Sequence, residues 1–525
     1  MTGDRRHVVL VGFMGAGKTT AAQALAGSSG LPVLDVDAEI VRGEGRSIEQ
    51  IFAADGEAAF RALEERAGLE LLDGASPRIV SLGDGALGSA ALREALGPHR
   101  VVWVDVDIDT AWARASGAGR PLARDRDAFA ALHEAREPVY AAVADLVVPQ
   151  ARVTALPGML ETLEGVPSGV RTLWATTPGA DSAADHPAYV GPGLLAGPPG
   201  EDGPRLPFWP ATVPGRRFLV TDYNAGRLYG ERLGSLDGRV TIMPGEQSKT
   251  VAHAEIVWSE LARAAMTRAD VVVALGGGVV GDLAGFCAAT YQRGVRVVQV
   301  PTTLVAQVDS AYGGKTGVDL AEAKNYVGAF HQPQAVIADT EALATLPAEE
   351  LAAGYAEVVK TALLAGGWLW EAVRSGADPT EPAIVAGCAH TKLRVVAADE
   401  RDTGLRQTLN LGHTVGHAIE TVTGYARYRH GEAVGLGLLA ALRLSGAEAL
   451  RDEVQDLLAA RGLPTALAGE VDPDAVVMAT ARDKKRVGEG PVPFVLLSAP
   501  GDARPGCAVA SADLIAAVRE LAAAS

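Results

Sequence analysis

The glycine-rich run from Gly12 to Thr19 is the first segment whose spacing could do chemistry. It reads G-F-M-G-A-G-K-T, which matches the phosphate-binding pattern G-x-x-x-x-G-K-[ST] and lies between a strand-like and a helix-forming stretch. Backbone N–H groups of such a loop hold phosphate oxygens, the lysine reaches the β and γ phosphates, and the hydroxyl ligates Mg²⁺. We therefore predict an ATP site, with a chance glycine turn as the alternative. Its residues are Gly15, Ala16, Gly17, Lys18, Thr19 and Thr20.

Two aspartates, Asp35 and Asp37, follow the next apolar stretch as D-V-D. Carboxylates at this place suit Mg²⁺-bound water and substrate hydroxyls. Acidic residues at strand ends are also common as solvated helix caps. A phosphate loop at the start of an α/β segment of this length suggests a small-molecule kinase.

Three of the ten histidines, His413, His417 and His430, fall within one short segment. The first two stand at i and i+4 and therefore share one face of a helix. Glu357 lies in a helix-forming stretch, one turn before Lys360. A His/His/Glu set with an open fourth position is the arrangement of a catalytic Zn²⁺. The spacing predicts a metal site, and core or capping histidines are the alternative.

A second glycine-rich turn, from Gly276 to Gly281, reads G-G-G-V-V-G directly after the apolar stretch D-V-V-V-A-L. The pattern G-x-G-x-x-G suggests a nucleotide pyrophosphate over a helix start, although a lone match is a weak signal. Composition adds an independent signal, because eight of the 47 basic residues are lysine. A chain that uses arginine elsewhere keeps lysine where a compact ammonium is needed. These lysines are Lys18, Lys249, Lys315, Lys324, Lys360, Lys392, Lys484 and Lys485.

The overall composition is that of an ordinary globular protein, with 48% hydrophobic and 21% charged residues among 525. A net charge of −17 without a long basic run makes nucleic acid a poor partner. Cys287, Cys388 and Cys507 lie far apart, which fits a reducing cytoplasm better than a disulfide framework. The apolar stretches are too short or too interrupted for a signal peptide or a membrane span. We expect a cytoplasmic protein that binds small molecules and neither nucleic acid nor membrane.

The elements that must position these residues change along the chain. Residues 7–150 alternate apolar strands with amphipathic helices, which predicts a parallel α/β domain. Residues 165–214 are rich in Pro, Gly, Ser and Asp, which is typical of a linker or surface loops. A second α/β pattern begins at Arg217, and helical Ala/Leu/Glu-rich periodicity takes over after Leu343.

Several separated stretches over residues 7–165 resemble the shikimate kinase family. They are L-D-V-D-A-E-I, I-E-Q-I-F-A-A-D-G-E-A-A-F-R, G-R-P-L and R-E-P-V-Y-A-A-V-A-D. The resemblance implies ATP- and Mg²⁺-dependent phosphorylation of shikimate to shikimate 3-phosphate. It implies that Asp35 assists Thr19 at the Mg²⁺ and that Arg120 is the lid arginine over ATP. The residues that would hold shikimate are Asp37, Arg61, Gly83 and Arg136, with both arginines on its carboxylate.

One position departs from that family. Its triple glycine after the third strand reads Gly83-Asp84-Gly85 here, which puts a carboxylate where the backbone should approach a hydroxyl and a γ-phosphate. We expect an active kinase because every charged partner is present. A weakened or regulatory kinase half is the alternative, and restoring glycine should raise turnover if Asp84 crowds the γ-phosphate.

A longer ordered series over residues 170–525 resembles 3-dehydroquinate synthase. Its stretches include P-G-E-Q-S-K-T, G-G-G-V-V-G-D-L-A-G-F, K-N-Y-V-G-A-F-H-Q-P, D-E-R-D-T-G-L-R and L-N-L-G-H-T-V-G-H-A-I-E. The resemblance implies cyclisation of 3-deoxy-D-arabino-heptulosonate 7-phosphate to 3-dehydroquinate, with NAD and Zn²⁺ or Co²⁺. NAD would oxidise carbon 5 so that phosphate leaves, and reduction, ring opening and aldol closure would follow.

The same resemblance implies three sets of site residues. The metal would be held by Glu357, His413 and His430. NAD would be held by Asp222, Asn224, Glu246, Lys249, Gly278, Val279, Val280, Gly281, Asp282, Thr302, Thr303, Lys324 and Thr345. The substrate would meet the catalytic residues Arg293, Asp309, Lys315, Asn325, Lys360, Lys392, Arg406, Asn410, His417 and Lys484. All the rare lysines except Lys18 fall in or beside these synthase motifs.

Together these features predict a bifunctional α/β enzyme of chorismate and aromatic amino acid biosynthesis. Its parts are a P-loop kinase domain with a parallel sheet at 1–165, a linker at 166–187, a Rossmann-like NAD-binding α/β domain at 188–340 and an α-helical metal- and substrate-binding domain at 341–525. The synthase half is a candidate for homodimer formation. A sister sugar-phosphate cyclase or a metal alcohol dehydrogenase is the alternative for this half, and Lys392, Arg406, Asn410 and His417 favour the dehydroquinate branch.

Overall fold

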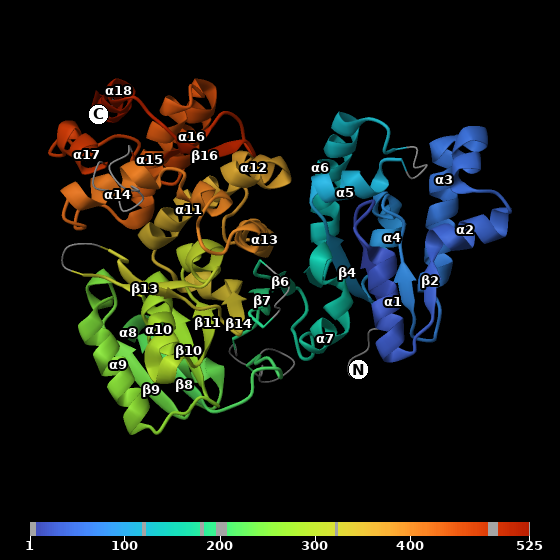
Figure 1. Ribbon diagram of the computed structural model, residues 1–525, viewed down its shortest axis with the longest axis horizontal. Coiled ribbons are helices and arrows are strands. Elements are labelled where there is room, and N and C mark those ends of the chain that lie inside the picture. The colour runs from blue at the N-terminus through green and yellow to red at the C-terminus, as the bar shows by residue number, and fades with distance from the viewer. Residues whose placement is uncertain are drawn as a thin grey trace. The chain divides into compact units, whose positions relative to one another are not determined.

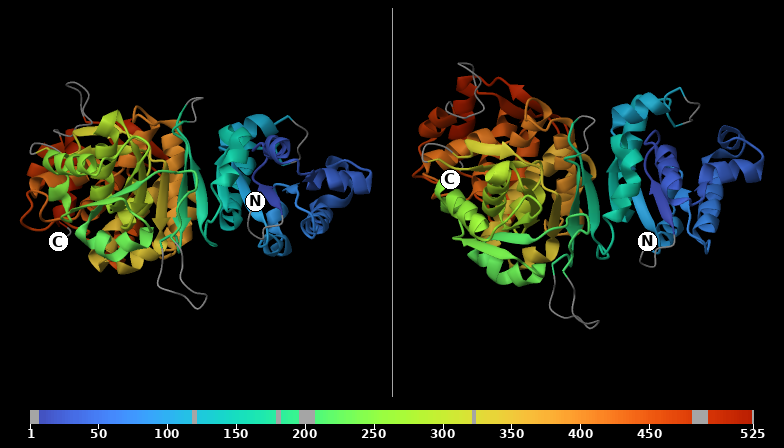
Figure 2. Two further views of the ribbon diagram at one scale, coloured as in Figure 1. Left: turned by 90° about the horizontal axis from the view of Figure 1, so that it is seen from below. Right: turned by 60° about the horizontal axis from the view of Figure 1, so that its bottom comes forward.

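The structure is a computed structural model that describes residues 7–117, 122–178, 183–195, 207–320, 324–480 and 492–523. It separates into two compact units, coloured blue to cyan and green to red in Figures 1 and 2. The N-terminal unit comprises Met1–Trp174 with Pro210–Thr212, and the C-terminal unit comprises Ala175–Trp209 with Val213–Ser525. None of the helices in the described ranges has both the length and the hydropathy that a membrane span requires.

The N-terminal unit is built on a parallel sheet with strand order β2-β3-β1-β4-β5-β6. Its strands are β1 (Val8–Val11), β2 (Val33–Asp35), β3 (Ile79–Ser81), β4 (Arg100–Asp105), β5 (Leu146–Pro149) and β6 (Arg171–Ala175). In the central strands nearly every residue is buried, because helices cover both faces of such a sheet. Its helices are α1 (Lys18–Ser29), α2 (Val36–Glu44), α3 (Ile48–Leu72), α4 (Ala90–Ala95), α5 (Ile108–Ala115), α6 (Arg126–Val143) and α7 (Leu156–Glu161).

The interval predicted as a linker, residues 166–187, contains regular structure at both ends. β6 pairs with β5 through Thr172 and Leu173, both of which are buried. β7 begins at His186 within the same interval. The apolar runs T-L-W and A-Y-V form these strands, and the Pro- and Gly-rich composition belongs to the residues between and after them. The N-terminal sheet therefore continues one strand beyond residue 165.

The C-terminal unit begins with parallel strands in the order β7-β14-β11-β10-β8-β9. Its strands are β7 (His186–Gly191), β8 (Arg217–Asp222), β9 (Gly238–Ile242), β10 (Val271–Gly276), β11 (Arg296–Pro301) and β14 (Ala335–Asp339). Helices α8 (Tyr223–Tyr229), α9 (Val251–Arg263) and α10 (Gly278–Thr290) pack against it, and β12 (Lys315–Val318) pairs with β13 (Val327–Phe330) in an antiparallel hairpin. Side chains of α9, α10 and the strands form one apolar core that includes Val257, Leu283 and Val272.

Helices dominate the rest of the C-terminal unit and gather on one side of its sheet (Figure 1). They are α11 (Ala348–Ala365), α12 (Gly367–Arg374), α13 (Pro382–Ala398), α14 (His413–Val422), α15 (His430–Leu444), α16 (Glu448–Ala460), α17 (Pro473–Thr480) and α18 (Ser511–Ala523). A small hairpin of β15 (Phe494–Leu497) and β16 (Ala503–Cys507) precedes α18. The predicted change from α/β to helical structure after Leu343 thus corresponds to the start of α11.

Candidate active sites

The phosphate loop of the N-terminal unit joins β1 to α1 and is braced from within. Lys18 Nζ donates to the carbonyl oxygens of Gly12 at 2.7 Å and Phe13 at 3.4 Å. Arg114 on α5 donates to the carbonyl oxygen of Gly15 at 3.1 Å. Helix α1 starts at this loop, so its positive N-terminal end adds to the charge of these cations. The loop is thus prepared for phosphate oxygens.

A cavity of about 720 Å³ connects this loop to the ends of β2 and β3. All six residues predicted to bind ATP line it, and so do Asp35, Asp37 and Gly83. One oxygen of Asp35 accepts the N–H of Ala38 at 3.2 Å, so this residue also caps α2. The predicted lid residue Arg120 lies outside the described residues.

Both arginines predicted for the shikimate carboxylate have acidic partners within the unit. Arg61 donates to Glu64 Oε2 at 2.6 Å and to Glu57 Oε1 at 3.0 Å. Arg136 forms an ion pair with Asp84. Glu64 is 1% exposed. Burial raises the pKa of Glu64, against the opposing effect of Arg61.

The side-chain ends of Glu64 and Arg61 pack against the two glycines of the segment Gly83-Asp84-Gly85. A Cβ at Gly83 would lie 2.0 Å from Glu64 Oε1, and one at Gly85 would lie 2.3 Å from Arg61 Nη1. The side chain at position 84 instead reaches Arg136, and the Tyr140 hydroxyl donates to the Asp84 carbonyl oxygen at 2.5 Å. Asp84 therefore pairs with the Arg136 guanidinium, which was predicted to bind the carboxylate of the substrate.

In the C-terminal unit three helices bring the predicted metal ligands together. Glu357 on α11 is fully buried, and its Oε1 lies 3.6 Å from His413 Nε2 and 3.3 Å from His430 Nε2. His413 begins α14 and His430 begins α15. The three ligand atoms all lie within 4.8 Å of one another. This spacing is that of a site for one metal ion.

Close helix packing produces this cluster. A Cβ at Gly431 would lie 1.8 Å from the carbonyl oxygen of Ala353, and one at Gly437 would lie 1.9 Å from that of Gly412. Glycine at these two positions lets α15 touch α11 and the start of α14. The contact carries His430 to Glu357 on one side and keeps it near His413 on the other.

Two buried lysines share one aspartate beside the metal cluster. Lys360 is 1% exposed and pairs with both Glu357 and Asp309, the latter at 3.3 Å. Lys392 pairs with the Asp309 carboxylate and donates to its carbonyl oxygen at 2.6 Å. Burial opposes the ionisation of Asp309, but the two lysines lower its pKa to about 2. A π-helical turn, Ala306–Ser310, presents Asp309 at this point.

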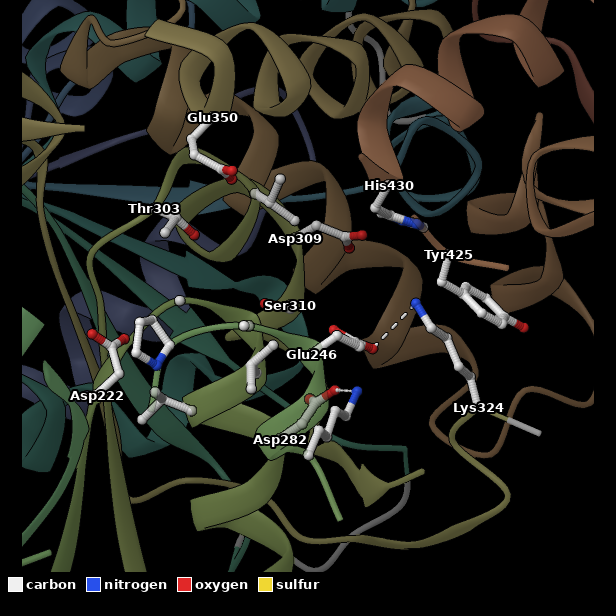
Figure 3. A pocket seen from close by; sticks show the side chains of 18 of the residues that line it. Asp222, Glu246, Asp282, Thr303, Asp309, Ser310, Lys324, Glu350, Tyr425 and His430 are labelled. Carbon is white, nitrogen blue, oxygen red and sulfur yellow. Dashed lines mark hydrogen bonds and ion pairs between the residues drawn. The ribbon is translucent and has the colours of Figure 1, made fainter. Parts of the chain in front are cut away.

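The metal cluster opens onto a cavity of about 810 Å³ (Figure 3). Asp309 and His430 lie on one side of it, and Asp222 and Asp282 lie on the other. Every residue predicted for NAD lines this cavity except Gly281, which is where α10 packs closely on Gln299 of β11. Lys324 bridges Glu246 at 3.3 Å, while Lys249 pairs with Asp282. The start of α10 at Gly278 thus faces a dinucleotide-sized space lined by both charged and apolar residues.

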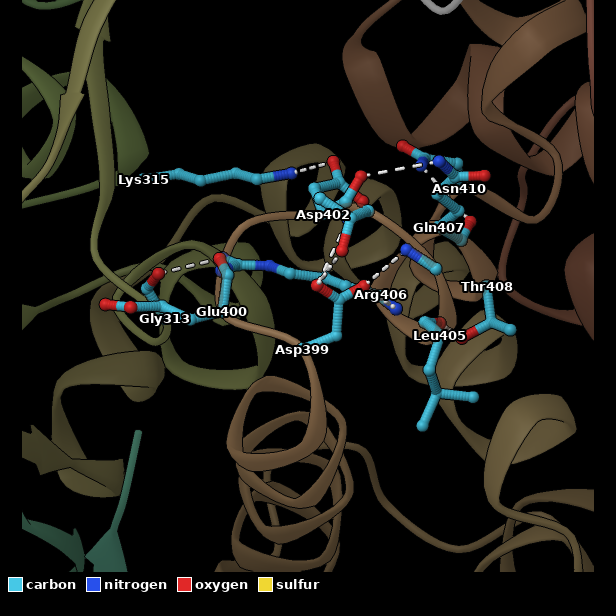
Figure 4. Close-up of polar contacts among 12 residues, drawn as sticks. Gly313, Lys315, Asp399, Glu400, Asp402, Leu405, Arg406, Gln407, Thr408 and Asn410 are labelled. Atoms are coloured by element: carbon cyan, nitrogen blue, oxygen red, sulfur yellow. Dashed lines mark hydrogen bonds and ion pairs between the residues drawn. The ribbon is translucent and has the colours of Figure 1, made fainter. Parts of the chain in front are cut away.

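The predicted substrate residues fall into separate groups. Asp309, Asn325 and His417 line the cavity directly, with Lys360 and Lys392 behind Asp309. Arg293 is exposed and is not among the lining residues, and Lys484 lies outside the described residues. Lys315, Arg406 and Asn410 belong to the polar cluster drawn in Figure 4.

That polar cluster is organised by the Asp399 carboxylate. It accepts the N–H groups of Thr403, Gly404 and Arg406 at 3.1, 2.7 and 3.0 Å. The Arg406 guanidinium donates to the carbonyl oxygens of Glu400 at 2.5 Å and Gly313 at 2.8 Å, and Lys315 pairs with Asp402 (Figure 4). Arg406 therefore ties the loop to the segment before β12 in addition to any contact with substrate.

Comparison with known proteins follows the same division of the chain. Family models match as 3-dehydroquinate synthase N-terminal over residues 239–353 and C-terminal over 354–486. The 3-dehydroquinate synthase of Symbiobacterium thermophilum is 44% identical over 337 residues, which cover 60% of this chain and 92% of that relative. The chain belongs to the 3-dehydroquinate synthase family. The synthase of Caulobacter vibrioides is 45% identical over 346 residues, covering 61% of this chain and 91% of that relative.

The N-terminal unit carries a second enzyme domain. The shikimate kinase family model matches residues 14–164. The chain thus joins a shikimate kinase domain to a 3-dehydroquinate synthase, as the separated sequence motifs predicted.

Solved structures agree with the fold of the synthase part. The 2-epi-5-epi-valiolone synthase of Streptomyces hygroscopicus subsp. jinggangensis, solved with NAD⁺ and Zn²⁺ bound, is 26% identical with a TM-score of 0.55, over 60% of this chain and 92% of that chain. A 2-deoxy-scyllo-inosose synthase, 23% identical with a TM-score of 0.56 over 66% of this chain and 99% of that one, shares the fold. These sister cyclases are less similar in sequence than the dehydroquinate synthases, which disfavours the sister-cyclase alternative.

Sequence reasoning missed three acidic residues that position others. Glu64 holds Arg61 in the kinase domain. In the synthase part, buried Glu420 lies 3.5 Å from His430 Nδ1 and 3.6 Å from Lys324, and Asp399 folds the Arg406 loop. Glu64 and Glu420 follow Arg61 and His417 by three residues, so helical spacing was an available signal, and Glu420 ends one of the quoted motifs.

Proposed function

We propose that this chain is an active bifunctional enzyme of the shikimate pathway. Its N-terminal unit would phosphorylate shikimate with ATP, and its C-terminal unit would cyclise 3-deoxy-D-arabino-heptulosonate 7-phosphate to 3-dehydroquinate with loss of phosphate. The family matches support both assignments. The observation that carries the proposal is that, within the described residues, each unit has a cavity whose lining includes many of the residues that the resemblance implies for its own enzyme.

In the kinase domain, Thr19 and Asp35 would hold Mg²⁺ and the loop from Gly15 to Thr20 would hold the ATP phosphates. Lys18, braced on the Gly12 carbonyl, is placed to neutralise charge on the transferred phosphoryl group. Asp37 lines the same cavity and would accept a hydrogen bond from the substrate hydroxyl. Arg61 and Arg136 would hold the carboxylate, and Gly83 lets the backbone approach the substrate.

The donor set of the synthase part fits a divalent metal ion. Glu357 is fully buried, and neither of its oxygens has a geometrically sound hydrogen-bond partner among the described residues, although two imidazoles and Lys360 lie beside it. Glu, His and His leave a fourth position for a substrate oxygen, which suits Zn²⁺ or Co²⁺. When bound, the metal would polarise the hydroxyl that is oxidised. Glu420 would orient His430 through its other ring nitrogen.

The larger cavity also fits NAD. The glycine turn leaves the start of α10 open to a pyrophosphate, and a Cβ at Gly277 would lie 2.9 Å from the Thr303 side chain. Bound NAD would supply a hydride acceptor that is restored within the same turnover. Asp222 and Asn224 line the far end of the cavity, at the start of α8, where a ribose hydroxyl could bind.

The remaining synthase residues would bind and orient an anionic sugar phosphate. Lys360, Lys392, Lys315 and Arg406 supply positive charge in a chain whose net charge is −17. Lys392 pairs with Asp309, which lines the cavity together with Asn325 and His417. Buried cations of this kind stabilise the negative charge that develops as phosphate leaves.

The test is to assay the intact protein with each substrate separately. Shikimate should release ADP from ATP only when Mg²⁺ is present. The heptulosonate phosphate should release inorganic phosphate while absorbance of NADH stays flat, because the hydride is returned. Stoichiometric NADH accumulation would make this half a dehydrogenase, and an absence of shikimate-dependent ADP release would remove the kinase assignment.

We further propose a cytoplasmic location, a domain boundary in the interval between β6 and β7, and a homodimer through the synthase half. All three cysteines are free thiols, which fits a reducing compartment. The exposed Arg293, a predicted substrate residue outside the cavity lining, is consistent with a site that a second copy completes. Sedimentation equilibrium of the intact chain would detect the dimer, and a monomer at micromolar concentration would contradict it.

A further inference from the structure

The described part of the kinase site pairs cations with acids before any substrate enters. Lys18 and Arg114 line its cavity together with Asp35, Asp37 and Asp84, and Arg61 and Arg136 pair with Glu64 and Asp84 beside it. Arg61 is on the same helix as its partner Glu64, three residues away. The Arg136–Asp84 pair joins α6 to the segment after β3, 52 residues earlier in the chain.

We propose that Asp84 is an internal counter-anion of Arg136, which competes with the substrate carboxylate and so sets how tightly the kinase domain binds shikimate. The inference rests on the proposed function of this domain. This effect differs from steric crowding of the γ-phosphate, because Asp84 competes for the arginine that binds the substrate carboxylate and does not act at the phosphate loop.

The surroundings hold Asp84 on Arg136. Tyr140 fixes the backbone of Asp84 through its carbonyl oxygen, and the side-chain ends of Glu64 and Arg61 lie close against the glycines on either side. The Arg136 guanidinium stacks over the Phe13 ring at 5.6 Å, which limits where it can turn. The side chains of Asp84 and Arg136 are only 19% and 14% exposed, so water screens the pair weakly.

The ionisation of Asp84 agrees with this geometry. Burial raises its pKa, but Arg136, Lys18 and Arg61 together lower it below the ordinary value. Asp84 is therefore a carboxylate at neutral pH. A second carboxylate at Arg136 would meet a like charge unless Asp84 moves away, and the displacement weakens binding.

The proposal predicts a change in one kinetic constant. Asp84→Asn keeps the shape and removes the charge, whereas Asp84→Gly removes the side chain. Both should lower the KM for shikimate about tenfold, which is the size of one charge-assisted hydrogen bond. The KM for ATP should change less than about twofold, because the phosphate loop keeps its partners.

The experiment measures KM for shikimate, KM for ATP and kcat on the full chain of the wild type, Asp84→Asn, Asp84→Gly and Glu70→Gln. Glu70 is an exposed residue on the same helix as Arg61 and serves as the matched acid-to-amide control. Phosphate release by the synthase half, measured on the same preparations, reports whether each variant is folded as a whole. Shikimate binding by calorimetry in the absence of ATP gives a readout that turnover cannot distort.

Equal affinity of wild type and Asp84→Asn for shikimate, in a protein that turns over, would overturn the inference and leave the kinase assignment intact. A gain in kcat or ATP affinity with unchanged shikimate affinity would show that Asp84 acts at the γ-phosphate. A gain in Asp84→Gly without one in Asp84→Asn would assign the effect to bulk and not charge, which also contradicts the proposal. No turnover or shikimate binding in any variant would overturn the proposed function itself.

Discussion

The two active sites differ in how their acidic side chains are shared among the neighbouring cations. In the synthase part, Lys360 and Lys392 share the single carboxylate of Asp309, and Glu357 is divided between Lys360 and two imidazoles. In the kinase domain, Arg136 forms its ion pair with Asp84, whose negative charge Lys18 and Arg61 also stabilise. In the synthase part the two lysines therefore divide their charge among carboxylates that have other partners as well, whereas the kinase has to exchange one carboxylate for another.

The difference shows two ways in which a protein can stabilise its substrate-binding cations when no substrate is present. A buried cation without a counter-charge is costly, so some acid must stand beside it. An acid that is shared between two cations neutralises only part of their charge, so the cations still attract an anionic substrate. An acid that pairs directly with a substrate-binding cation removes most of that attraction, and the substrate carboxylate must then compete with it for the cation.

Removal of a metal ligand should have the largest effect and should be confined to one site. We expect His413→Ala to lower synthase activity at least about 100-fold, because two protein ligands hold the metal weakly. Kinase activity should remain within about twofold. Metal content by mass spectrometry, together with phosphate and ADP release, checks the prediction. His253→Ala on α9 is the control, and retention of the metal by His413→Ala would contradict the assignment of this ligand.

Removal of one of the two lysines that share Asp309 tests how much that lysine contributes to substrate binding. We expect Lys392→Ala to lower kcat/KM of the synthase about 10- to 100-fold, since the Asp309 carboxylate loses one of its two cations and the anionic substrate loses a cationic partner. Arg394→Ala, an exposed change two residues further along α13, is the control. If Lys392→Ala behaved like Arg394→Ala in steady-state kinetics, Lys392 would have no part in substrate handling.

The Arg406 loop should show its dependence on Asp399 in stability. Burial raises the pKa of Asp399, but the N–H groups of Thr403, Arg406 and Gly404 bring it to about 2, below the ordinary 3.8. The carboxylate therefore stabilises the fold above pH ~4, and this stabilisation is lost as pH falls toward 2. We expect Asp399→Asn to lower the free energy of unfolding by no more than about 2 kcal/mol at pH 7.

Urea unfolding of both proteins between pH 3 and 7 measures this difference. The gap between wild type and Asp399→Asn should narrow toward acid pH, because protonation of Asp399 removes the same interaction. The exposed change Asp452→Asn should stay within about 0.5 kcal/mol of wild type throughout. A gap that is independent of pH would exclude the ionised Asp399 as its source.

Separation of the two units should have the smallest effect. We expect chains 1–178 and 183–525 to retain kinase and synthase activity within about threefold, because each cavity is lined by residues of one unit. Steady-state assays of the separate chains, alone and mixed, check this. Recovery of a lost activity only on mixing would reveal dependence of one unit on the other.

Much of the fold and several of the proposed site residues followed from local patterns, and the other proposed site residues came from the family resemblance. The phosphate loop, the glycine turn of α10 and the helical spacing of His413 and His417 depend on short-range geometry, which a sequence displays directly. The strands β6 and β7 were obscured because flanking Pro and Gly residues dominate the composition of the interval. A strand of five or six residues gives too weak a signal to outweigh such neighbours.

What the sequence determined by itself was a set of chemical groups: the motifs named the two enzyme families and many of the residues that line the cavities. Only the tertiary structure decided how those groups pair. Glu357 meets His430 because Gly431 and Gly437 let α15 approach two other segments, and Asp84 meets Arg136 across a loop and a helix far apart in the chain. Charge interactions depend on distance and burial, and separation along the chain specifies neither.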